Sequence, residues 1–177
     1  MAKPVRIVIH HSANPTKEAQ LGITNVYHAS KGFLKSTLGY HVGYSYFIER
    51  DGKTIQTRTD TEEQAHTKGL NYDSIGICLA GDFSQERPSF EQTLALKNLI
   101  NQKMREYGIL PSGISGHRML RDTECPGSKV TEKELRDLFM PDISYYQNLL
   151  NTLRELLEKL LQRSTKVGHE IDNTCDK

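Results

Sequence analysis

Hydrophobic and polar positions along the chain alternate between a period of two and a helical period, which predicts strands and helices in succession. Three apolar or alternating stretches are rich in β-branched and aromatic residues and have the length expected of strands. The second of them is expected to form a hairpin with a tight turn at Asp51-Gly52. These stretches are Val5–His10, Tyr44–Gln56 and Ser74–Ala80. A fourth strand, short and centred on Ile114-Ser115, is expected just before His117.

Three segments of helical period separate or follow these strands. Ser89 is a favourable N-cap for the longest of them, and Gly108 is typical of a helix end. The predicted helices are Ala19–Lys31, Ser89–Tyr107 and Thr131–Phe139. Because helices and strands alternate, we expect an α/β fold, with a mixed central sheet flanked by helices in a single domain over residues 1–140.

The remainder of the chain has a different pattern. Between Asp142 and Arg163 leucines and other apolar residues recur in alternating steps of three and four, which predicts a long amphipathic helix over residues 141–165. Three roles stay open for it: packing on its own domain, assembling a homo-oligomer, or lying on a membrane surface. Residues 166–177 are polar and are expected to form a flexible tail.

Composition narrows the class of protein. Hydrophobic residues make up 36% of the 177 residues, and the net charge of +1 leaves no basic surface of the kind that binds nucleic acid. No apolar run is long enough to cross a membrane, and the first residues do not resemble a signal peptide, so we expect synthesis in the cytoplasm. The three cysteines are too few and too scattered for a disulfide framework.

Three short segments carry residues of the type that bind zinc. They are Val8–Ser12 with two histidines, Gly116–Arg118 with His117, and Thr123–Gly127 with Cys125. Imidazole and thiolate are the ligands that Zn²⁺ takes in tetrahedral sites, and three protein ligands leave one position open for water, as in catalytic zinc sites. His10 and His11 are neighbours on a predicted strand and point to opposite faces, so spacing alone does not decide which of them contributes.

The order of several short motifs resembles the type 2 N-acetylmuramoyl-L-alanine amidases, a family that includes small phage amidases and the peptidoglycan-recognition proteins. The matching stretches run from about residue 5 to about residue 139, and they are Ile9–Ala13, Val42–Ile48, Arg50–Gly52, His66–Gly69, Asn71–Ile77, Gly81–Phe83, Gly116–Arg118 and Thr123–Gly127. The predicted C-terminal helix lies outside the resemblance.

The resemblance implies a ligand set of His10, His117 and Cys125 for one Zn²⁺ ion, which leaves His11 in the core or behind the ligands. It also implies roles for four polar residues. Tyr44 corresponds to the family's catalytic tyrosine, and Thr123 is a candidate helper that can donate a hydrogen bond. His66 and Asn71 are expected to contact the substrate, although a satisfied surface histidine and an ordinary loop asparagine are the plain alternatives.

The function implied by the resemblance is zinc-dependent hydrolysis of the amide between N-acetylmuramic acid and the L-alanine of peptidoglycan. Because Zn²⁺ lowers the pKa of a bound water to about 7, such a site works near neutral pH. We expect a phage or prophage endolysin that reaches the cell wall after release from the cytoplasm. The alternatives are a bacterial wall-recycling or effector amidase, and a module that recognises peptidoglycan without cutting it.

Overall fold

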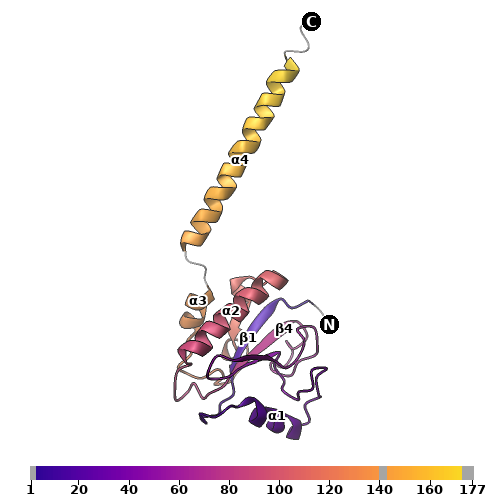
Figure 1. Cartoon of the computed structure of the whole chain (residues 1–177), viewed down its shortest axis with the longest axis vertical. Helices are drawn as coiled ribbons and strands as arrows, with labels where there is room; N and C mark the ends of the chain where they lie inside the picture. Colours follow the sequence, from indigo (N-terminus) through magenta and orange to yellow (C-terminus); the bar gives the residue numbers. More distant parts are fainter. Residues whose placement is uncertain (1–2, 140–142, 173–177) are drawn as a thin grey trace. The chain divides into compact units, whose positions relative to one another are not determined.

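The computed structural model describes residues 3–139 and 143–172, and its centre is a mixed sheet with the strand order β3-β2-β4-β1-β5 (Figure 1). The strands are β1 Arg6–His11, β2 Tyr46–Ile48, β3 Thr54–Gln56, β4 Ser74–Leu79 and β5 Ile114–Gly116. Strand β1 runs parallel to both of its neighbours, β4 and β5, and only the β2–β3 hairpin is antiparallel. The predicted α/β fold is confirmed.

Helices cover both faces of this sheet: Figure 1 shows α2 and α3 on one side of β1 and β4, and α1 on the other. Their bounds are α1 Leu21–Ser30, α2 Phe90–Tyr107 and α3 Glu132–Phe139. The start of α2 is fixed as the sequence predicts, because the Ser89 hydroxyl accepts a hydrogen bond from the Gln92 backbone N–H and the Gln92 side-chain oxygen accepts one from the Ser89 backbone N–H. Gly108 ends the helix in the left-handed conformation, with φ 70°.

The alternation of side chains along β1 and β4 separates two apolar clusters. Ile7, Ile9 and their partners on β4 pack with α2 and α3, whereas Phe47 and Cys78 form a smaller cluster on the opposite face. Residue His10 lies in register with Cys78, on the face of the smaller cluster. The functional side chains described below therefore stand on the α1 side of the sheet, and the larger core supports them from behind.

The chain divides into two compact units, Met1–Phe139 and Met140–Lys177. The second unit contains α4, Ile143–Asp172, which continues past residue 165, where the sequence pattern placed its end. Extending an established helix costs far less than starting one, so polar residues without a proline can prolong it. Residues 173–177 of the predicted tail lie outside the described residues.

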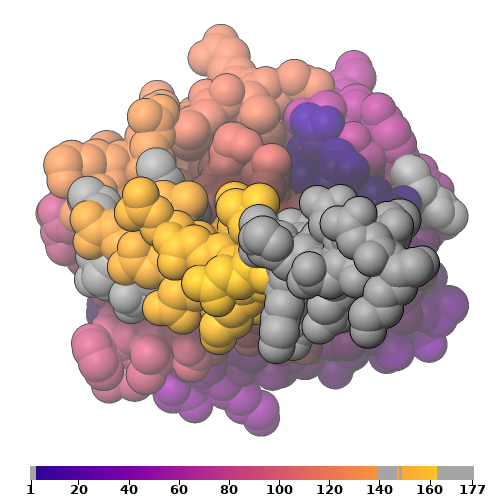
Figure 2. Space-filling model, turned by 90° about the horizontal axis from the view of Figure 1, so that it is seen from above, coloured from indigo at the N-terminus to yellow at the C-terminus, as the bar shows by residue number. Residues whose placement is uncertain are grey.

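Helix α4, drawn in orange to yellow where Figure 2 colours it, carries a series of exposed leucines. Those of its described part have between 45% and 64% of their surface exposed and are Leu149, Leu150, Leu153, Leu156, Leu157, Leu160 and Leu161. Across residues 3–139 and 143–172, no helix combines the length and the apolar character needed to cross a membrane.

A buried ion pair ties α2 to the loop after the hairpin. The Lys103 ammonium group lies 2.6 Å from the Asp60 carboxylate, and the Tyr107 hydroxyl donates to the same carboxylate oxygen at 3.0 Å. Both charged side chains are about 5% exposed, and Lys103 also lies 5.3 Å from the centre of the Tyr46 ring. Removing one partner of a buried pair leaves the other charge without compensation, which costs more than the pair contributes.

We therefore expect Lys103→Met to lower the free energy of unfolding by about 3 kcal/mol, because the buried Asp60 carboxylate loses its cationic partner. The double variant Lys103→Met/Asp60→Asn is expected to recover part of that loss. Urea unfolding followed by circular dichroism measures both, with Lys97→Met, at an exposed position of the same helix, as the control. A loss in Lys103→Met no larger than in the control would contradict this account.

Candidate metal centre

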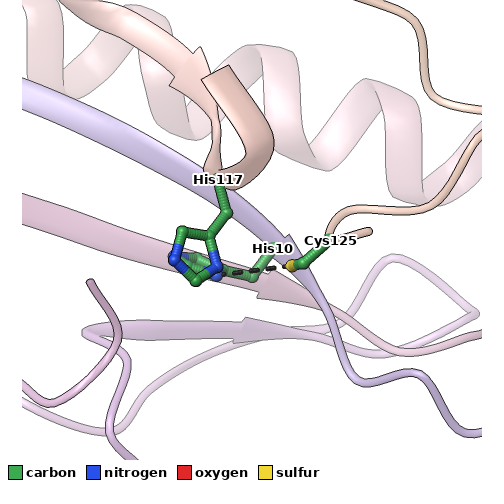
Figure 3. A group of neighbouring side chains, drawn as sticks. All are labelled: His10, His117 and Cys125. Atoms are coloured by element: carbon green, nitrogen blue, oxygen red, sulfur yellow. Dashed lines mark hydrogen bonds between the residues drawn. The ribbon is translucent and has the colours of Figure 1, made fainter. Parts of the chain in front are cut away.

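Parallel pairing of β1 with β5 brings the two candidate histidine ligands together. Ile9 pairs with Gly116, so the next residues, His10 and His117, stand at the same level where the two strands end. Their ring centres are 4.5 Å apart. His117 opens a short 3₁₀ turn, His117–Met119, directly after β5, and this turn directs its side chain back toward β1 (Figure 3).

Cys125 reaches the same point from the loop that follows. The Arg118 backbone N–H donates to the Cys125 carbonyl at 2.8 Å, and the Arg118 guanidinium donates to the carbonyl oxygens of Gly127 and Val130. Gly127 has φ 96°, and a Cβ there would come within 2.3 Å of the Phe83 backbone, so only glycine fits. These contacts hold the cysteine loop against its neighbours.

The three side chains point toward one another in Figure 3, and each offers one ligand atom within 4.8 Å of the other two. Cys125 Sγ lies 3.5 Å from His10 Nδ1. Bond lengths of about 2.3 Å to sulfur and about 2.0 Å to nitrogen, at the tetrahedral angle, give a sulfur–nitrogen separation of about 3.5 Å. The residues therefore fit a tetrahedral zinc ion, with His10 presenting Nδ1 to it.

Burial keeps the two histidines in the form that binds metal. It lowers the pKa of His10, whose ring is 1% exposed, and nearby His66 and His117 lower it further; burial also lowers the pKa of His117. Burial raises the pKa of the Cys125 thiol to about 11, although Arg118 opposes this. A metal ion that binds here has to displace the thiol proton, which is what coordinated cysteines undergo.

His11 is not part of this group. Its ring accepts a hydrogen bond from the Phe83 backbone N–H at 3.1 Å and lies beside the Phe83 ring, on the α2 and α3 side of the sheet. The pleat of β1 thus places His10, and not His11, beside His117 and Cys125.

A cavity of about 850 Å³ opens over the three residues. Its wall includes Tyr44, Thr123 and His66 of the sequence-predicted site, together with His28 and Phe33 from α1 and the loop that follows. The Tyr44 ring centre lies 5.0 Å from that of His10. Burial is the main cause that raises the pKa of the Tyr44 hydroxyl well above the usual value, and Cys78 and Cys125 raise it further. Tyr44 is therefore a neutral hydrogen-bond donor at any physiological pH.

Thr123, His66 and Asn71 occupy distinct places. The Thr123 hydroxyl accepts from the Cys125 backbone N–H at 3.3 Å, which leaves its own proton to donate elsewhere. His66 is 9% exposed and its Nδ1 lies 2.9 Å from His10 Nε2, behind the ligand. The Asn71 side chain accepts from the backbone N–H groups of His66 and Thr67 and so shapes this loop. Contact of His66 and Asn71 with substrate stays a prediction.

Sequence reasoning left His28 without a role, and the structure gives it one. His28 Nδ1 accepts a hydrogen bond from the backbone N–H of Gly43, the residue before Tyr44, at 3.1 Å. Its ring stacks on Phe33 and lies 5.6 Å from the Tyr44 ring. Burial, with a smaller effect of Arg58, lowers the pKa of His28 to about 4. The signal was a lone histidine near the end of a predicted helix, which alone is too common to indicate a position beside Tyr44.

Residues 1–128, which include all the residues of this site, match the model of the N-acetylmuramoyl-L-alanine amidase family. The chain belongs to this family. The family resemblance expected from the sequence motifs is confirmed.

Two kinds of amidase-family relative are similar to this chain. Peptidoglycan-recognition protein LB of Drosophila melanogaster is 33% identical over 131 residues, which are 70% of this chain and 55% of the relative, so the chain spans about half of that protein. The solved endolysin amidase LysCS from Clostridium intestinale superposes with a TM-score of 0.66 at 27% identity, covering 76% of this chain and 82% of LysCS. A Drosophila PGRP-LB variant in complex with tracheal cytotoxin has a TM-score of 0.62 at 28% identity, covering 75% and 80%.

The neutral state of His28 predicts a pH dependence of stability. Its folded pKa of about 4 lies below the ordinary value of 6.5, so the unfolded chain binds more protons between these pH values and stability falls as the pH drops through them. His28→Asn keeps an acceptor for the Gly43 N–H and does not titrate. We expect wild type to lose on the order of 2 kcal/mol more unfolding free energy than this variant between pH 7 and pH 5. Urea titrations at both pH values measure the difference, and parallel losses in the two proteins would refute it.

Proposed function

We propose that this chain is a zinc-dependent amidase that hydrolyses the bond between N-acetylmuramic acid and L-alanine in peptidoglycan. The observation that carries the proposal is the convergence of His10, His117 and Cys125 at the base of a cavity bordered by Tyr44. Membership of the amidase family and the likeness to the endolysin amidase LysCS support this reaction. The PGRP-LB variant in complex with tracheal cytotoxin supports a wall-derived ligand.

His10, His117 and Cys125 would hold the zinc ion, which when bound lowers the pKa of water to about 7 and polarises a carbonyl group. The remaining chemistry falls to the cavity wall. The neutral Tyr44 hydroxyl can donate a hydrogen bond to the oxyanion that forms when the amide carbonyl is attacked. Thr123 can donate a second one, because its oxygen is already occupied by the Cys125 N–H. Ile23, Tyr27 and Phe33 beside His28 give the other side of the cavity an apolar wall.

Cys125 favours catalysis over recognition alone. The members of the resembling family that bind without cutting characteristically lack this cysteine, and here it faces His10 at 3.5 Å. An endolysin is the biological setting that we propose, acting on the wall after release from the cytoplasm. A wall-recycling or effector amidase would use the same residues and differs in the substrate it meets.

The direct test measures stem peptides with a free L-alanine amine, released from purified peptidoglycan and detected by mass spectrometry. Cys125→Ala is expected to lose zinc and activity together, because one of three ligands is gone. Tyr44→Phe is expected to keep zinc and to lower kcat by about 10²- to 10³-fold, the usual effect of removing one oxyanion donor. His41→Gln, which replaces a histidine outside the cavity, is the control. Wall binding without peptide release by zinc-loaded wild type would identify a recognition module instead.

Helix α4 gives the proposed amidase a way to assemble. At 100° per residue, its leucines at 149, 150, 153, 156, 157 and 160 fall within an arc of about 120°, which is wider than a two-stranded seam and suits a bundle. The charged residues between them are Arg154, Glu155, Glu158 and Lys159, two of each sign. This balance lacks the basic excess of membrane-surface helices and places no net repulsion between copies. We propose that copies of α4 associate with one another, which would give several catalytic units to one polymeric wall.

Light scattering after size-exclusion chromatography tests this assembly on the full chain. Wild type is expected to elute as an oligomer of more than two chains, and Leu153→Glu/Leu157→Glu as a monomer, because charges within the apolar arc cannot be buried without partners. Glu158→Gln on the polar face is expected to leave the mass unchanged. A monomeric wild type at every concentration tested would remove the proposal.

A further inference from the structure

A chain of hydrogen bonds runs from His10 through His66, in the cavity wall, toward strand β4. His10 Nε2 lies 2.9 Å from His66 Nδ1, and the two rings meet edge to face with an angle of 85° between their planes. His66 Nε2 lies 3.1 Å from the Ser74 hydroxyl, which itself donates to the Leu70 carbonyl. The groups are buried and connect β1, the 64–73 loop and β4.

Counting protons along this chain fixes the tautomer of each ring. The Leu70 carbonyl can only accept a hydrogen bond, so the Ser74 hydroxyl donates its single proton to it. Ser74 Oγ therefore accepts from His66 Nε2, which must carry a hydrogen. A neutral imidazole has one N–H, so His66 Nδ1 is left with a lone pair. The Thr67 hydroxyl, 3.0 Å from the same Nδ1, is consistent with this, because it can donate to that lone pair.

The consequence reaches the ligand. Because His66 Nδ1 can only accept, the 2.9 Å contact requires His10 to carry its hydrogen on Nε2. The lone pair of His10 is then on Nδ1, which is the nitrogen that faces Cys125 Sγ. The opposite arrangement would put a hydrogen on the nitrogen that has to bind the metal. Hydrogen bonds from ligand histidines to a second group are known to set ring orientation and metal affinity.

The sheet is built to admit the His66 ring. A Cβ placed on Gly76 would lie 2.7 Å from His66 Cγ and Cδ2, so the ring packs directly over a glycine of β4. Gln64, from the same loop, accepts from the Gly76 backbone N–H and donates to the Ser74 carbonyl, which holds the loop against the strand. The position of His66 is thus specified by packing as well as by its hydrogen bonds.

We infer that His66 is a positioning residue that sets the tautomer of His10 and thereby presents Nδ1 to the metal. This assignment rests on the proposed zinc site and adds to it a group that touches neither the ion nor the reacting amide. The buried relay Leu70–Ser74–His66–His10 gives a structural reason for a histidine at position 66.

Zinc affinity, measured at one pH by competition with a chromogenic chelator and without any peptidoglycan, tests the assignment. His66→Phe fills the space without an acceptor and is expected to weaken zinc binding by about 10- to 100-fold. His66→Asn, which restores an acceptor near the position of Nδ1, is expected to stay close to wild type. Thr67→Val, which removes the other contact of that nitrogen and leaves the relay intact, is the matched control.

Each result separates the inference from the proposed function. Tight zinc binding by His66→Phe would overturn the inference and leave the amidase proposal standing, whereas a wild type that binds no zinc would overturn both. Equal losses in His66→Asn and His66→Phe would show that His66 acts by packing alone. Thermal unfolding of the metal-free variants shows that each is folded, and Gly76→Ala, which displaces the ring with His66 retained, is expected to weaken zinc binding in the same way.

The tautomers themselves are observable. Long-range proton–nitrogen correlation spectra of ¹⁵N-labelled, zinc-loaded protein distinguish the two nitrogens of each imidazole. We expect hydrogens on His10 Nε2 and His66 Nε2, and a metal-shifted signal from His10 Nδ1. A hydrogen on His66 Nδ1 would contradict the relay even if the affinities followed the expected order.

Discussion

The parallel pairing of β1 with β4 and β5 is the constraint on which the site depends. It brings the ends of three strands and the loops that follow them to one edge of the sheet, where backbone hydrogen bonds fix the level of each residue. His10 and His117 meet because Ile9 and Gly116 are paired, and no contact between the histidines is needed to bring them there. The larger apolar cluster packs on the other face of β1 and stabilises it there, so the side chains of the candidate metal centre contribute little to the stability of the fold.

Much of this arrangement could be predicted from the sequence because it follows local rules. The period of two in Val5–His10, the Asp51-Gly52 turn and the Ser89 cap each specify an element without reference to the rest of the chain. The grouping of His117 with Cys125 was also predictable, since only a short loop separates them. The spacing of residues did not distinguish His10 from His11, because that choice depends on which face of the sheet meets α2, a property of tertiary packing; only the family resemblance implied His10.

The roles of buried polar residues were the least predictable part. His66, Ser74 and Gly76 lie on a loop and a strand whose sequences give no sign that they form a single hydrogen-bonded group. Lys103 and Asp60 are more than forty residues apart and resemble ordinary surface charges until the fold buries both. The role of a buried polar side chain depends on partners that are distant in sequence. Hydrophobic periodicity indicates only which faces are apolar, so it does not reveal these partners.

The mixed nitrogen and sulfur character of the candidate metal centre has a consequence for ion competition. His10, His117 and Cys125 are held by β1, β5 and the loop tied down by Arg118, and they offer no oxygen ligand among them. Mg²⁺ and Ca²⁺ bind through several oxygen atoms and complete their shells with water. These abundant ions therefore gain little at this centre, and a scarce, softer cation can occupy it without being displaced by them.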